Sequence, residues 1–266
     1  MKKTKLLIGL LLIVFLAKAQ ENPKKCGTTP LMEHEIKTNP QYKNIVENYF
    51  NGLEEWLKNN SNSKNSVITI PVVVHVIHDM GSENISDASI QGALDFLNAN
   101  INGQAANFLA KTPDVFAAVR GDLNVEFRLA KLDPDSNPTT GINRVRSSLT
   151  FEPDPANSVK RLSYWNSFQY FNIWTVQKFL PQDDGNTLLG YAQFPWSGSM
   201  STDGVVLLSS QMVSGGTLTH EVGHWLGLCH VWDCGGGECG DDGVSDTPPA
   251  RDPNFGVDLT DFPYHV

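Results

Sequence analysis

The stretch LTHEVGHWLGLCH, residues 218–230, holds three histidines, a glutamate and a glycine at fixed spacings. His220 and His224 are four residues apart, so a helix would place both imidazoles on one face, one turn apart. Glu221 would project beside them, where it can reach a metal-bound water without being a ligand itself. The spacing therefore predicts a helix that presents two metal ligands and a neighbouring base.

His230 can join this pair only if the helix ends before it. A continued helix would carry His230 about 15 Å further along the axis, at about 1.5 Å per residue. A Zn–N bond is only about 2.0–2.1 Å long. The chain must therefore turn back, and Gly227 stands where a residue with positive φ is needed.

Three neutral imidazoles leave a fourth position open, which is typical of catalytic rather than structural zinc. Such an ion acidifies a bound water, and Glu221 would take its proton as the water attacks a carbonyl. The five fixed positions would co-occur by chance in about one of 10⁵ chains of this composition. The sequence thus predicts a zinc hydrolase with a peptide bond as substrate.

The rest of the chain predicts an α/β sandwich with a twisted sheet. A β-branched run at 67–78 reads as a buried strand, and Ser86 is expected to cap a helix that runs through about Asn100. The apolar face of this helix would comprise Ile90, Ala93, Leu94 and Leu97. Further strands are expected at 123–130, 169–177 and 203–210, with an edge strand at 190–196 that ends at Pro195.

The N-terminal third predicts export and processing. Residues 1–19 combine lysines, an apolar run and small residues, which is typical of a signal peptide and too short for a membrane span. Residues 20–66 are expected to form a pro-segment, with an amphipathic helix over 42–57 and an Asn/Ser-rich linker at 59–66. Residues 67–266 would be the catalytic domain, and the protein would be secreted.

The mature chain is acidic. Signal removal takes four lysines and moves the formal charge from −9 to about −13. This charge argues against nucleic acid and against stable membrane association after signal cleavage. It leaves protein or peptide substrates as the expected partners and indicates no oligomeric state.

The cysteines are unevenly placed, with Cys26 near the start and Cys229, Cys234 and Cys239 close together. An exported protein can keep disulfide bonds, yet three cysteines cannot all pair with one another. Cys229 could be a buried thiol or half of a disulfide. The remaining histidines, His34, His75, His78 and His265, are expected to be ordinary residues, because none has a partner at metal-ligand spacing.

The pattern His220-Glu221-x-x-His224-x-x-Gly227-x-x-His230 resembles the extended zinc motif of the metzincin metallopeptidases. The segments THEVGHWLGLCHVW, GDDGVSDTPP, IPVVVHVIH and GYAQFPWSGSMSTDGVVL are similar to the pappalysin family, in particular its secreted bacterial, cytophagalysin-like members. The resemblance implies a metzincin-like zincin fold. An upper subdomain would carry the sheet, a substrate-aligning edge strand and the active-site helix, and a lower subdomain would follow Gly227.

The resemblance also implies two further sites. KKCG looks like the latency segment of relatives in which a pro-segment thiolate occupies the open zinc position, which would make Cys26 the switch. A disulfide of Cys26 is the alternative, and Glu33 or Glu35 could replace it as an acidic switch. GDDGVSDTP resembles a structural calcium loop with Asp242, Ser245, Asp246 and Thr247 as ligands; the alternative is an acidic surface turn.

Metzincins carry a methionine turn beneath the zinc, downstream of the third histidine. All five methionines of this chain precede the motif. The expectation is a C-terminally truncated metzincin with an incomplete lower subdomain, whose chain alone has weak peptidase activity or none. The competing interpretation is a catalytically impaired fragment or an exported binding module that retains the zinc site.

Overall fold

The computed structural model describes residues 24–60, 66–111, 121–151, 157–180, 187–214 and 216–232, together with 242, 244, 247 and 250. Within these residues a seven-stranded sheet runs in the order β1-β6-β7-β5-β2-β3, and β4 also pairs with β2. The strands are β1 Lys24–Cys26, β2 Ile68–His78, β3 Val125–Leu129, β4 Ile142–Arg146, β5 Phe171–Val176, β6 Thr187–Ala192 and β7 Val205–Leu208. Helices cover this sheet, so the α/β fold class is confirmed.

The β-branched run forms the strand β2, whose second half is fully buried, as predicted. It lies parallel to β5 on one edge, while β3 and β4 share its other edge, β3 along the first half and β4 along the second. Gly141, with φ of +74°, stands just before β4. A Cβ atom there would lie 2.7 Å from the Ala130 backbone nitrogen, so this close approach requires glycine.

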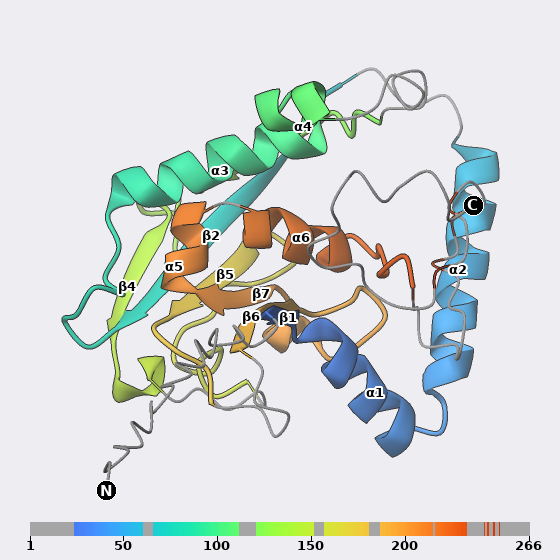
Figure 1. Ribbon diagram of the computed structural model, residues 1–266, viewed down its shortest axis with the longest axis horizontal. Helices are drawn as coiled ribbons and strands as arrows, with labels where there is room; N and C mark the ends of the chain where they lie inside the picture. Colours follow the sequence, from blue (N-terminus) through green and yellow to red (C-terminus); the bar gives the residue numbers. More distant parts are fainter. Residues whose placement is uncertain are drawn as a thin grey trace, which may run out of the picture.

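Helices α3 Asp87–Ile101, α5 Ser209–Ser214 and α6 Gly216–Trp225 lie along one face of the sheet (Figure 1). The Ser86 side chain accepts a hydrogen bond from the Ser89 backbone and caps α3. The predicted face of α3 is buried in one core cluster, which also contains residues of β2, β5 and β7. A second cluster, built around Trp174, Val206 and Leu208, covers the opposite face.

The strand next to the helix of the motif differs from the prediction. β6 covers Thr187–Ala192 rather than 190–196, and it is not an edge, because β7 pairs with one side and β1 with the other. Pro195 lacks a backbone N–H and cannot extend the ladder. Phe194 and Trp196 instead leave the sheet and stack on each other.

The N-terminal segment contains β1 and two helices, α1 Thr28–Thr38 and α2 Tyr42–Asn59. The amphipathic helix is confirmed as α2, which packs on Phe194 and Trp196 through Tyr42, Tyr49 and Phe50. Its partners follow the end of β6, and α2 lies beyond the C-terminal end of the motif helix α6 (Figure 1). None of the helices in the described ranges is long and apolar enough to cross a bilayer.

Short elements complete the described fold. They are the helix α4 Ala106–Lys111 and the 3₁₀ turns η2 Ser148–Thr150 and η3 Met200–Thr202. The predicted signal peptide and most of the predicted calcium loop lie outside the described residues.

Candidate metal centre

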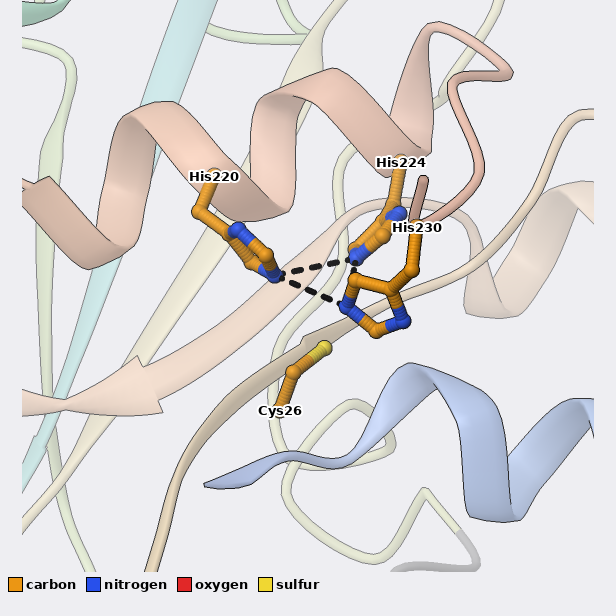
Figure 2. A group of neighbouring side chains, drawn as sticks. All are labelled: Cys26, His220, His224 and His230. Carbon is orange, nitrogen blue, oxygen red and sulfur yellow. Dashed lines mark hydrogen bonds between the residues drawn. The ribbon is translucent and has the colours of Figure 1, made fainter. Parts of the chain in front are cut away.

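Helix α6 carries His220 and His224 and ends at Trp225. The backbone N–H of Gly227 donates to the His224 carbonyl, and that of Leu228 donates to Gly223. Gly227 has φ of +96°, a conformation that disfavours residues with a Cβ atom. The chain reverses here and returns His230 to the face of α6 that holds the other two histidines (Figure 2).

The three histidines converge through their Nε2 atoms (Figure 2). The Nε2 of His220 lies 3.1 Å from that of His224 and 3.2 Å from that of His230, and the last pair is 3.1 Å apart. Ligands about 2.05 Å from one tetrahedral ion would be about 3.3 Å apart. Three converging lone pairs repel one another unless a cation lies between them. The triangle therefore fits a single zinc ion.

Two of the three imidazoles are oriented through their other nitrogen. The Nδ1 of His224 lies 2.7 Å from the Leu228 carbonyl oxygen, which can only accept a hydrogen bond. The Nδ1 of His230 lies 3.0 Å from the Thr29 hydroxyl. A proton on Nδ1 leaves Nε2 free to bind a metal. Burial and the neighbouring His220 lower the pKa of His224 to about 3, which favours the neutral, ligating form.

Cys26 is the fourth member of this group. Its Sγ and the ligand atoms of the three histidines all lie within 4.8 Å of one another, and Figure 2 shows the thiol pointing at the triangle from β1. Burial, followed by the nearby Glu221 charge, raises the pKa of the thiol. Glu33 is exposed and pairs with Lys37, and Glu35 is outside the group. The structure thus brings Cys26, not either glutamate, to the histidines.

Glu221 lies fully buried beside the triangle. Burial raises the pKa of its carboxyl to about 8. Its Oε2 accepts a hydrogen bond from the Thr28 hydroxyl at 3.1 Å and lies 3.6 Å from Cys26 Sγ. Its Oε1 has no hydrogen-bond partner within the described residues. Burial thus leaves one oxygen of the Glu221 carboxyl unpaired beside the three histidines.

The contacts of Thr28 and Thr29 were not predicted from the sequence. Thr28 contacts Glu221, which lies 193 positions later in the sequence, and Thr29 contacts His230, which lies 201 positions later. Threonine carries no spacing signal for such contacts. Only the pairing of β1 with β6 brings them to the site.

The structure describes only some of the cysteines and of the predicted calcium ligands. Cys26 is a free thiol, whereas Cys229 takes part in a disulfide bond; Cys234 and Cys239 are outside the described residues. Asp242 and Thr247 are described, and the Asp242 carboxylate accepts from the Val244 N–H, but Ser245 and Asp246 are not.

The remaining histidines fall outside the metal group, as far as they are described. His75 is buried and bonded to Asn172, and His78 accepts a hydrogen bond from the Met80 N–H. His34 is exposed on α1, and His265 lies outside the described residues.

Comparison with known proteins identifies relatives of this site. The peptidase family M43 profile, described as pregnancy-associated plasma protein-A, matches residues 156–258. An extracellular metalloprotease of Colletotrichum graminicola is 30% identical over 210 residues, which cover 72% of this chain and 62% of that protein. The chain thus spans about three-fifths of the length of this curated relative.

Two solved structures of Tannerella forsythia proteins share the fold. A mutant of promirolysin superposes with a TM-score of 0.71 at 37% identity, covering 85% of this chain and 76% of its own. Mature mirolysin in complex with a cleaved peptide superposes with a TM-score of 0.64 at 40% identity, and the match covers 71% of this chain and 74% of that chain. Identity at this level over most of both chains shows common descent as well as a common fold. The chain therefore belongs to the pappalysin family of metzincin metallopeptidases.

Proposed function

We propose that this chain is the latent precursor of a secreted zinc metalloendopeptidase. The observation that carries the proposal is the triangle of His220, His224 and His230 with Glu221 buried beside it. A structural zinc site would have no use for an unpaired carboxylate oxygen at this position. Mature mirolysin, a relative, is described in complex with a cleaved peptide, which supports peptides as the substrate class.

The three histidines would hold the zinc through Nε2, with the Thr29 hydroxyl and the Leu228 carbonyl fixing two of the rings. Zinc bound there supplies Lewis-acid chemistry, which polarises a carbonyl group and acidifies water. Glu221 acts as general base and takes a proton from the attacking water. It then passes this proton to the leaving amine. Gly227 shapes the turn that brings His230 to the other two ligands.

Latency would come from the N-terminal segment. Cys26 reaches the three histidines from β1 and would take the fourth ligand position as a thiolate. Residues 1–19 would be the signal peptide, 20–66 the pro-segment and 67–266 the catalytic domain. Relatives named extracellular metalloproteases support secretion. Calcium binding by the loop with Asp242 stays a prediction.

Glu221→Gln tests the catalytic assignment, because it removes the base and keeps the shape. The assay follows cleavage of an unfolded protein by the chain after proteolytic removal of the N-terminal segment, with zinc content measured in parallel. We expect wild-type zinc content in the variant and at least about 100-fold slower cleavage. Equal cleavage by both proteins would refute the role of Glu221. Zinc without cleavage in the wild type would favour the alternative, a catalytically impaired fragment or an exported binding module that retains the zinc site.

A further inference from the structure

Thr28, the first residue of α1, joins two groups of the catalytic region through one hydroxyl. Its Oγ1 donates to Glu221 Oε2 at 3.1 Å and accepts from the Ala192 backbone N–H at 3.0 Å. A hydroxyl has one proton to give and lone pairs to accept with, so the two bonds are compatible. The side chain is only 1% exposed. Water therefore does not compete for either contact.

Ala192 is the last residue of β6, and its N–H points away from β7. Gly190, two residues earlier, presents its carbonyl in the same direction and accepts from the Gly27 N–H at 2.8 Å. Residues 26–28 thus occupy the hydrogen-bonding groups at the end of β6 that face away from β7. Without these residues, the Ala192 N–H and the Gly190 carbonyl would be free to pair with an extended peptide.

We propose that Thr28 is a positioning residue of latency, a clamp that holds Glu221 and the Ala192 N–H at once. The proposal rests on the proposed function. It adds a second inhibitory contact to the one that the Cys26 thiol would make. Cys26 faces the three histidines, whereas Thr28 holds the base and the end of the neighbouring strand. Release of the N-terminal segment then frees the Glu221 carboxyl and the Ala192 N–H at the same time.

If the Thr28 side chain had only a structural role, a different outcome would be expected. The Thr28 N–H donates to Cys26 Sγ at 3.3 Å, and this backbone contact survives any side-chain change. Loss of the hydroxyl alone therefore tests the clamp. Thr38, at the other end of α1, provides the matched control, because its hydroxyl bonds only within the helix, to the His34 carbonyl.

The experiment compares Thr28→Val, Thr28→Ser and Thr38→Val in the full, unprocessed chain. The first readout is the rate of Cys26 alkylation by iodoacetamide after zinc removal with a chelator, with Cys26 followed by peptide mass mapping. The second is cleavage of a fluorogenic peptide by the zinc-loaded chain before processing. Loss of the buried hydrogen bond to Glu221 in Thr28→Val should raise both rates about tenfold. Thr28→Ser should stay within about threefold of wild type, and Thr38→Val should match it.

Wild-type rates in Thr28→Val, or equal acceleration in Thr28→Ser, would overturn the clamp. If Thr28→Val does not fold, Thr28→Ala removes the same hydroxyl without adding a methyl group in new surroundings, and the same rates decide. The alkylation rate needs no catalysis. Faster alkylation in Thr28→Val without peptide cleavage by any processed form would uphold the contact and refute the proposed function instead.

Discussion

Gly227→Ala is the substitution that most directly tests how the turn after α6 builds the metal centre. Gly227 has φ of +96°. The nearest atoms to an added Cβ would be Trp196 Cζ3 at 3.5 Å and Tyr49 Oη at 3.6 Å, which are ordinary contacts. The methyl group therefore fits, and the cost of the substitution lies in the backbone conformation alone.

A left-handed backbone costs a residue with a Cβ atom about 1–2 kcal/mol. In the zinc-free chain the turn can shift, because no metal ion holds His230 against the other histidines. Zinc binding removes that freedom, so the strain appears as weaker binding. We expect zinc affinity to fall about tenfold, since 1.4 kcal/mol corresponds to a factor of ten.

The assay is competition for zinc against a chromophoric chelator, together with urea unfolding in the presence and absence of zinc. Gly223→Ala is the matched control, because Gly223 lies inside α6 and its added Cβ would be 3.7 Å from Leu228. Alanine inside a helix stabilises by about 0.5–1 kcal/mol. Wild-type zinc affinity in Gly227→Ala, or an equal loss in Gly223→Ala, would refute the reasoning.

Two further predictions concern stability. Burial lowers the pKa of His75 to about 4, so between pH 4 and pH 6.5 this side chain binds a proton in the unfolded chain but not in the folded one. The contribution of His75 to stability should therefore be complete above pH 6.5 and fall by up to about 3 kcal/mol towards pH 4. Urea unfolding of the zinc-free protein checks this, and a His75→Gln variant with an equally steep pH dependence would contradict it. Leu97→Ala, in the buried face of α3, should cost about 2–5 kcal/mol in the same assay. Leu53→Ala, on exposed α2 surface, should change stability by less than about 0.5 kcal/mol, and similar losses in both would refute the assigned burial.

The local sequence pattern was sufficient to predict those elements whose structure depends on residues close together in the sequence. The spacing of Ile90, Ala93, Leu94 and Leu97 predicted the buried face of α3, and Ser86 its cap. The apolar run of β2 predicted a strand covered on both faces. The i, i+4 histidines predicted the ligand-bearing helix, because a helix fixes which side chains share a face.

The sequence pattern did not predict elements and contacts that depend on pairing between segments far apart in the sequence. Residues 24–26 show no strand signal, and β1 forms only because β6 offers a free edge. For the same reason the contacts of Thr28 with Glu221 and Ala192 could not be predicted. β4 has little apolar alternation and was not predicted; it is a strand because it pairs with the second half of β2. The sequence left Cys26 and two glutamates open as the switch, and the pairing of β1 with β6 brings the thiol, rather than either glutamate, to the histidines.

The most direct test of the account is the zinc content of the full chain, compared with His224→Ala. His224 is buried and lies 3.1 Å from both other histidines through Nε2. After zinc loading and removal of free metal, we predict about one zinc per wild-type chain and almost none in the variant. Zinc retained by folded His224→Ala, or absent from the folded wild type, would contradict the claim that these three histidines form a metal centre.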